Sequence, residues 1–192
     1  MTKAMPTQGI DLKSGVYRTP ENFMNAVKKE FRIIGDLAAN EENKQAYHFV
    51  HQSQDALSED WADLQRFFEG DEGEGFLWLN PPYDNIGKWA EKCAVESVAG
   101  AKILLLVPAA VGSNWYRKYV EGFAAVRFLT GRLVFDFDYP EDYIDKKTGK
   151  LSPKAGKPNT DPYPKDLLLA ISDRGLAQDE RYAETWNWKA YL

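Results

Sequence analysis

The segment FLWLNPPYDN, residues 76–85, joins an apolar run to residues that can bind an aromatic amine. Asn80 offers an amide oxygen, and Pro81 offers a carbonyl oxygen in a rigid frame because proline has no N–H donor. Tyr83 adds a flat face for stacking. Together these groups suit a planar heterocycle with an exocyclic NH2, whose two hydrogens would be accepted while its ring lies on the tyrosine.

Accepting both hydrogens changes the reactivity of such an amine. Its lone pair is normally delocalised into the ring, and holding both N–H bonds favours a pyramidal nitrogen whose lone pair points out of the ring plane. An electrophile held in line can then be attacked, with proximity supplying much of the acceleration. No metal or strong base is needed. The alternative is that Asn80–Tyr83 is only a turn that ends a strand.

The place of this turn in the chain favours the chemical interpretation. The run 76–79 predicts a buried strand, and Pro81 and Pro82 stop it because they remove two backbone donors. The apolar spacing that follows predicts a helix over 86–98. The turn therefore lies between a strand and a helix.

Strands and helices alternate along the rest of the chain. Pro20 opens a helix for which Thr19 is the expected N-cap. Further helices are expected over 58–68 and 115–120, and a short helical turn within 38–47. Strands are expected over 31–35, 102–107, 124–129 and 166–171, with 133–137 leading back toward the sheet.

This order predicts an α/β fold with a mostly parallel sheet. Asp36, Asn80 and Pro108 each follow a predicted strand, so we expect them to share the carboxyl edge of the sheet. Ligands of such sheets bind at that edge.

The totals fit one domain: the chain has 192 residues, of which 44% are hydrophobic and 28% charged. We expect a flexible lead-in over 1–15 and a domain over 16–192 that contains a long loop at 139–165. No run is long and apolar enough to span a membrane, and the N-terminus has no apolar core typical of a secretory signal. With Cys93 as the single cysteine, a reducing compartment and a cytoplasmic location are the simplest interpretation.

The net charge of −5 argues against binding nucleic acid over a broad basic surface. A local basic patch remains possible in the long loop, which is either a solvated polar segment or a phosphate-contacting one. Its lysines are Lys146, Lys147, Lys150, Lys154, Lys157 and Lys165. His48 and His51 lack a third ligand at suitable spacing, so we expect no metal site there.

Several motifs in one order resemble a known family. Asn80–Tyr83 is similar to the catalytic motif of S-adenosylmethionine-dependent amino-methyltransferases, and the chain as a whole resembles the phage-type DNA N6-adenine methyltransferases from about residue 17 to 172. The motifs are Tyr17-Arg18-Thr19-Pro20, Asp36-Leu37-Ala38-Ala39 with Asn43, Asp55-Ala56-Leu57 with Trp61, Asn80-Pro81-Pro82-Tyr83 with Ile86 and Trp89, Leu106-Val107-Pro108-Ala109, Trp115, and Gly131-Arg132-Leu133-Val134-Phe135.

The resemblance implies a Rossmann-like methyltransferase fold with an antiparallel last strand, and S-adenosylmethionine as the cofactor. It implies a catalytic motif of Asn80, Pro81, Pro82 and Tyr83, with Asn80 also beside the cofactor. The other implied cofactor-binding residues are Tyr17, Thr19, Pro20, Asp36, Ala38 and Asp55.

The local sequence supports some of these roles and leaves alternative roles open for other residues. Backbone N–H groups at the helix start near Thr19 suit the cofactor's carboxylate, and Asp36 can accept hydrogen bonds from the cofactor. Ala38 still permits close approach where many such enzymes carry glycine. Capping of a local turn is the alternative for Asp36, and an ordinary helix-start role is the alternative for Asp55.

On the substrate side, the resemblance implies adenine in double-stranded DNA, flipped out to reach Asn80. Arg132, Lys146, Lys147 and Lys150 are the candidate DNA contacts, with an ion pair as the alternative for Arg132. For Trp115 and Tyr116 we favour packing over stacking on a base. The motif alone fits cytosine N4, an RNA base or a glutamine amide equally well, and a non-catalytic DNA-binding relative is the other class. A phage or prophage origin and protection from restriction are also implied.

Overall fold

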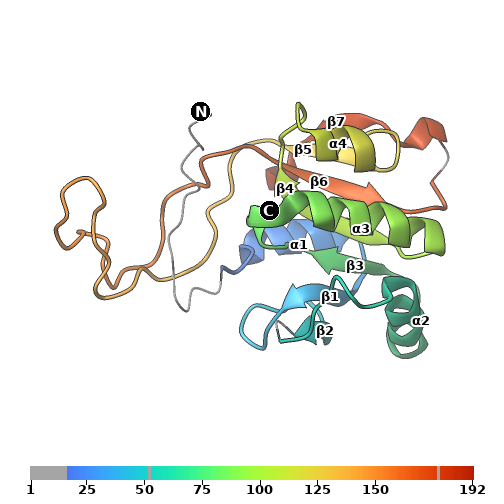
Figure 1. Cartoon of the computed structure of the whole chain (residues 1–192), viewed down its shortest axis with the longest axis horizontal. Helices are drawn as coiled ribbons and strands as arrows, with labels where there is room; N and C mark the ends of the chain where they lie inside the picture. The colour runs from blue at the N-terminus through green and yellow to red at the C-terminus, as the bar shows by residue number, and fades with distance from the viewer. Residues whose placement is uncertain (1–16, 52, 177) are drawn as a thin grey trace.

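Seven strands form one sheet in the part of the chain that the structure describes, residues 17–192 without 52 and 177 (Figure 1). The structure is a computed structural model, and the predicted lead-in over 1–15 lies outside the described residues. The strand order is β2-β1-β3-β4-β6-β5-β7. The strands are β1 Ile33–Ala39, β2 His48–His51, β3 Phe76–Leu79, β4 Ile103–Pro108, β5 Ala125–Leu129, β6 Leu167–Ser172 and β7 Ala183–Trp186.

The strand directions confirm the predicted fold class. β2, β1, β3 and β4 run parallel to one another, and β7 runs parallel to β5. β6 is antiparallel to both of its neighbours, β4 and β5. The sheet is therefore mostly parallel with one antiparallel strand, as a Rossmann-like methyltransferase fold requires.

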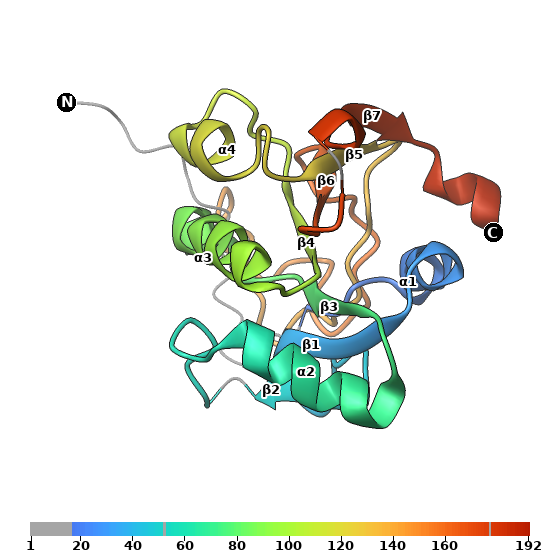
Figure 2. The same cartoon turned by 90° about the vertical axis from the view of Figure 1, so that its right-hand side faces the viewer.

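Helices cover both faces of this sheet (Figure 2). α2 (Trp61–Glu72), α3 (Ile86–Ala99) and α4 (Asn114–Tyr119) pack on one face, while α1 (Glu21–Glu30) packs on the other beside the C-terminal segment. Burial of β4 on both faces of the sheet explains why its sequence is continuously apolar. Ile103, Leu105 and Val107 enter the first core, and Leu104 and Leu106 enter the second.

The N-terminal half differs from prediction at β1. The expected strand ends before Asp36, but β1 continues to Ala39, so Asp36 lies within the strand. The short helical turn predicted within 38–47 lies at 40–44, where the N–H of Lys44 donates to the carbonyl of Asn40 at 3.1 Å, whereas Ala38 and Ala39 belong to β1. Asp36 and Ala39 both pair with β2, which extends β1 past the expected end.

Smaller differences concern element ends. α1 begins at Glu21 with Pro20 at the N-cap position, so Thr19 is not the cap as predicted. α2 begins three residues later than expected because the side chain of Asp60 caps it, accepting from the N–H of Asp63 at 2.8 Å. Residues 133–137 form no strand; Asp136 bridges to Arg18, and the buried side chains of Leu133, Phe135 and Phe137 pack in the second core.

The long segment 139–165 leaves the sheet at its carboxyl edge. β5 ends beside the start of β6, and Leu167 at that start pairs with Pro108 at the end of β4. The chain between β5 and β6 therefore departs from the edge where β3 and β4 end. Figure 1 shows this segment extending well away from the sheet.

Candidate active site

The Asn80–Tyr83 turn joins β3 directly to α3. Pro82 has φ −56° and ψ 129°, and a 3-10 turn, η1 (Tyr83–Asn85), leads into α3 at Ile86. Pro81 is buried, whereas Pro82 is exposed. The two prolines thus end the strand and present Asn80 at the carboxyl edge, as predicted.

The side-chain amide of Asn80 is held from both ends. Its Nδ2 donates to Thr19 Oγ1 at 3.1 Å, and its Oδ1 accepts from the Tyr83 hydroxyl at 2.9 Å. Thr19 is only 6% exposed. Because a carbonyl oxygen has two lone pairs, Oδ1 keeps one free for a further donor.

Tyr83 is a donor rather than a free stacking surface in this arrangement. Its ring packs edge-on against Tyr163, with centroids 5.6 Å apart. Burial, with a smaller contribution from Tyr163, raises the pKa of Tyr83 well above its usual value, so the hydroxyl keeps its proton. Tyr163 has no sequence signal that would have identified it, since it lies in the long loop.

Asp36 is a buried carboxylate, 3% exposed. Its Oδ1 accepts from the N–H of Ala38 at 3.1 Å and its Oδ2 from the N–H of Gln45 at 3.0 Å. Burial raises the pKa of Asp36 to about 7, and these hydrogen bonds and the charge of Lys28 only partly oppose the rise. The bond to Gln45 also fixes the turn after β1, which is the capping role foreseen as the alternative.

A hollow at the carboxyl edge brings together five of the predicted residues: Tyr17, Thr19, Asp36, Ala38 and Asn80. Asn43, a member of the family motif, and Trp78, which sequence reasoning treated only as strand, complete its walls. Its volume is about 10 Å³, roughly the room that one water needs. Among the predicted site residues that line the hollow, Tyr17 is the most exposed, at 38%. Its ring packs edge-on against Phe137.

Other predicted residues lie outside this hollow. Asp55 is exposed, and its Oδ1 accepts from the N–H of Leu57 at 3.2 Å. Pro20 is buried at the N-cap position of α1. Arg132 forms the ion pair foreseen as the alternative, with Nε 3.4 Å from Asp166 Oδ1. Among the described residues, no cluster of three or more histidine, cysteine, aspartate or glutamate side chains could hold a metal ion.

Comparison with known proteins fits this geometry. The sequence profile described as DNA N-6-adenine-methyltransferase (Dam) matches residues 8–160, most of the chain. The chain belongs to the Dam family. A curated relative from Escherichia phage T1, described as a DNA N-6-adenine-methyltransferase, is 25% identical over 122 residues, which are 64% of this chain and 47% of that protein. The chain thus spans about half the length of the curated relative it matches.

In this Dam-family chain, the segment 139–165 is an arm with paired limbs. Asn159 N–H donates to the carbonyl of Phe137 at 2.8 Å, Tyr139 N–H to that of Lys157 at 2.9 Å, and Ile144 bridges to Leu151. At the tip, Asp145 Oδ1 accepts from the N–H groups of Lys147 and Thr148. The predicted DNA contacts Lys146, Lys147 and Lys150 are all exposed at this tip.

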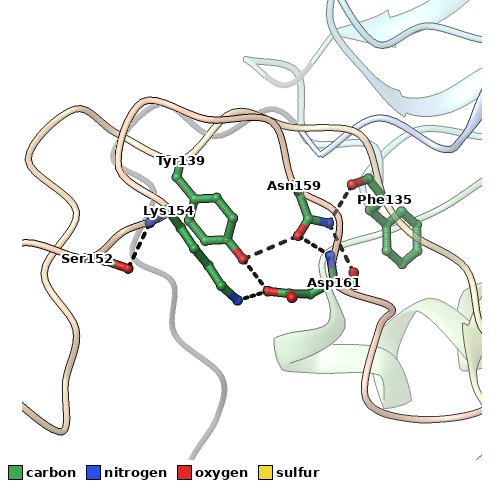
Figure 3. Close-up of polar contacts among 6 residues, drawn as sticks. All are labelled: Phe135, Tyr139, Ser152, Lys154, Asn159 and Asp161. Atoms are coloured by element: carbon green, nitrogen blue, oxygen red, sulfur yellow. Dashed lines mark hydrogen bonds and ion pairs between the residues drawn. The ribbon is translucent and has the colours of Figure 1, made fainter.

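A polar cluster closes the base of the arm (Figure 3). The Tyr139 hydroxyl lies 2.8 Å from Asp161 Oδ2 and 3.2 Å from Asn159 Oδ1. Lys154 pairs with the same carboxylate, and Asn159 Nδ2 donates to the carbonyl of Phe135 at 2.8 Å. The cluster joins the two limbs, so the tip with its lysines lies at the end of a structured element.

No helix among the described residues is long and apolar enough to cross a membrane.

Proposed function

We propose that this Dam-family protein transfers a methyl group from S-adenosylmethionine to the N6 amine of adenine in double-stranded DNA. The proposal rests on the position and hydrogen bonding of Asn80. Its side chain lines a hollow beside the buried Asp36, and its Oδ1 keeps one lone pair free. Family membership supports the same activity.

The residues of the turn would prepare the amine. Asn80 Oδ1 accepts one amine hydrogen and the carbonyl of Pro81 accepts the other, which localises the lone pair on nitrogen. Tyr83 and Thr19 act on Asn80 rather than on the base, since their hydrogen bonds fix which end of the amide faces the hollow. Positioning then supplies much of the rate.

The polar groups around the hollow fit S-adenosylmethionine, which when bound supplies an electrophilic methyl group on a sulfonium centre. Asp36 offers carboxylate lone pairs, and the start of α1 near Thr19 and Pro20 offers backbone donors for a carboxylate. Tyr17, Ala38 and Asn80 complete the proposed cofactor contacts, and Asp55 is the proposed partner of the cofactor's adenine. The room beside Asn80 is only about 10 Å³, and the proposal includes that the walls of the hollow separate when the cofactor enters.

The target base must leave the duplex to reach Asn80. The lysines at the arm tip, Lys146, Lys147 and Lys150, are the proposed contacts to the surrounding DNA. Lysine contacts to phosphate give affinity and fix the register of the protein on the duplex.

Labelled S-adenosylmethionine and unmethylated duplex DNA test the proposal, with digestion to nucleosides after the reaction. Label should appear in N6-methyladenine. Label in N4-methylcytosine, in RNA or in protein would contradict the assignment of the base. Retained cofactor binding without any transfer would instead support a non-catalytic relative.

Asn80→Ala should lower turnover by roughly 10²–10³-fold, the usual cost of removing one preorganised polar group at a reaction centre. The matched control is Asn85→Ala, an exposed asparagine in the same connection whose side chain makes no capping hydrogen bond. Calorimetry with S-adenosylmethionine should show a largely intact affinity for Asn80→Ala, because Asn80 is one of several proposed cofactor contacts, and an unchanged affinity for Asn85→Ala. A near wild-type rate for Asn80→Ala would mean that its amide oxygen does not position the amine.

A further inference from the structure

A second pocket opens at the carboxyl edge, separate from the hollow beside Asn80. Its volume is about 280 Å³, close to the lower end of ligand pockets. It is lined by Pro108, Ala109, Ala110, Arg132, Pro164, Lys165 and Asp166. The floor carries only small side chains, so a ligand's backbone can approach the end of β4 closely.

The charges of this pocket are two cations and one carboxylate. Arg132 and Asp166 are both largely exposed and meet at 3.4 Å, a weak contact because water screens it. Lys165 has no ion-pair partner among the residues that the structure describes. The pocket therefore keeps spare positive charge, in a chain whose net charge is −5.

The floor offers no donors for reading a base. The N–H of Ala109 donates to the carbonyl of Asp166, and the N–H of Ala110 donates to the carbonyl of Pro108. With these groups used internally, the polar atoms left to a ligand belong mainly to the charged side chains. Two cations above a small apolar floor suit a sugar-phosphate.

The pocket lies next to the proposed catalytic turn. Asn80 follows β3, Pro108 ends β4, and Leu167 begins β6, in three neighbouring strands. Adjacent strands are about 4.8 Å apart, so the pocket lies roughly 5–10 Å along the edge from Asn80. Tyr163, which packs on Tyr83, precedes Pro164 of the pocket wall.

We propose that Arg132 and Lys165 bind the DNA backbone phosphate next to the target adenine, and that Asp166 competes with this phosphate for Arg132. The inference rests on the proposed function and adds a phosphate site to it. Without DNA, Arg132 pairs with Asp166; with DNA, the phosphate replaces the carboxylate. Such a contact holds the flipped nucleotide's strand in register and carries no sequence information.

Duplexes with single neutral methylphosphonates test this site. The modified adenine is first mapped by sequencing methylated DNA, and each phosphate around it is then neutralised in turn. Wild-type protein should lose about tenfold in affinity at one position flanking the adenine. Arg132→Gln/Lys165→Gln should lose as much on unmodified DNA, show no further loss at that position, and have a salt dependence smaller by about one phosphate contact.

Two further variants separate this role from a structural one. Asp166→Asn should bind DNA more tightly than wild type, because it removes the competing carboxylate. Arg66→Gln/Lys102→Gln removes two charges away from this edge, since the exposed Arg66 lies on α2 and the partly exposed Lys102 precedes β4, and should leave the methylphosphonate pattern unchanged. If Arg132→Gln/Lys165→Gln responds to every methylphosphonate as wild type does, or Asp166→Asn binds more weakly, the inference is wrong. Failure of the proposed function would appear separately, as absence of N6-methyladenine with wild-type protein.

Discussion

Two hydrogen bonds fix the amide of Asn80, one donated to Thr19 Oγ1 and one accepted from the Tyr83 hydroxyl. Its type and its place after a strand predict an amine-binding amide at the sheet edge, and the structure puts it beside the hollow. The hydrogen bond from its Nδ2 joins it to Thr19, 61 residues away, and no local pattern could indicate that contact. The sequence predicts Thr19 as a helix N-cap and as a cofactor contact, whereas its contact with Asn80 comes from tertiary packing.

Tyr83→Phe tests the positioning of the Asn80 amide. The change removes the hydroxyl that donates to Asn80 Oδ1 and keeps the ring against Tyr163. Turnover should fall about tenfold, equivalent to about 1.4 kcal/mol in the barrier, while the affinity for S-adenosylmethionine is retained. Tyr119→Phe is the control, since its hydroxyl bonds only to Glu91 near the surface. Equal turnover in the two variants would exclude a role for the Tyr83 hydroxyl.

The raised pKa of Asp36 predicts how cofactor binding depends on pH. Burial raises the pKa of Asp36 to about 7, and the proposed contact needs the ionised carboxylate as acceptor. The dissociation constant for S-adenosylmethionine should therefore be flat above about pH 7.5 and rise up to about tenfold for each pH unit below about pH 6.5. Isothermal titration across this range measures it. A dissociation constant that does not change with pH would remove Asp36 from the contact.

The same carboxylate should give the stability of the fold the opposite pH dependence. Its pKa is 3.8 in the unfolded reference and about 7 in the folded chain, so the folded state binds the proton more tightly. Its contribution to the free energy of unfolding is present below about pH 4 and is lost as pH rises to about 7. Denaturation curves of wild type and Asp36→Asn at several pH values isolate this term. The stability of wild type relative to Asp36→Asn should fall over that range, and a constant difference would contradict the assignment.

At the scale of elements, long apolar segments were predictable and short edge strands were not. β3 and β4 are buried on both faces, which leaves an apolar run that any reading of the sequence detects. β2 reads HFVH and β7 reads AETW, each with one buried residue, and they become strands by pairing with β1 and β5 at the sheet edges. Their conformation depends on partners that local sequence does not specify.

The turn 40–47 is the element expected to respond to cofactor. Asn43 forms part of the hollow's wall, and Gln45 is tied to Asp36. Since the hollow is too small for the cofactor, we expect this turn to open and then close around it. Hydrogen exchange of amides in 40–47 should slow on adding S-adenosylmethionine, while amides of β6 stay unchanged. No protection in 40–47 would place the cofactor elsewhere.

The arm makes a separable prediction. Replacing residues 145–150 with Asn-Gly removes three tip lysines while keeping a two-residue turn between Ile144 and Leu151, which already bridge. Affinity for every duplex sequence should fall, and cofactor affinity should remain. Lys146→Gln/Lys147→Gln/Lys150→Gln controls for length and should show the same loss. Unchanged DNA affinity in both would exclude the tip from contact.

For the whole molecule, net charge limits how DNA can be held. At −5 the chain as a whole repels a polyanion, so binding must come from a few local cations near the carboxyl edge. Composition predicted this restriction, and the loop lysines were visible in the sequence. The convergence of Arg132 with Lys165 was not, because it depends on the antiparallel return of β6 beside β4.

The salt dependence of DNA affinity tests this picture of local contacts. The three arm-tip lysines are proposed to contact three phosphates, and Arg132 and Lys165 share a fourth. At about 0.9 counterion released per phosphate, log K should fall with log salt with a slope near −3.6. The arm replacement should remove about 2.7 of this slope and Arg132→Gln/Lys165→Gln about 0.9, and the two losses should add because the sites share no partners. Filter binding over a series of salt concentrations gives each slope. A wild-type slope near −10 would require a broad phosphate-binding surface, which the acidic chain would have to build from cations outside these two sites.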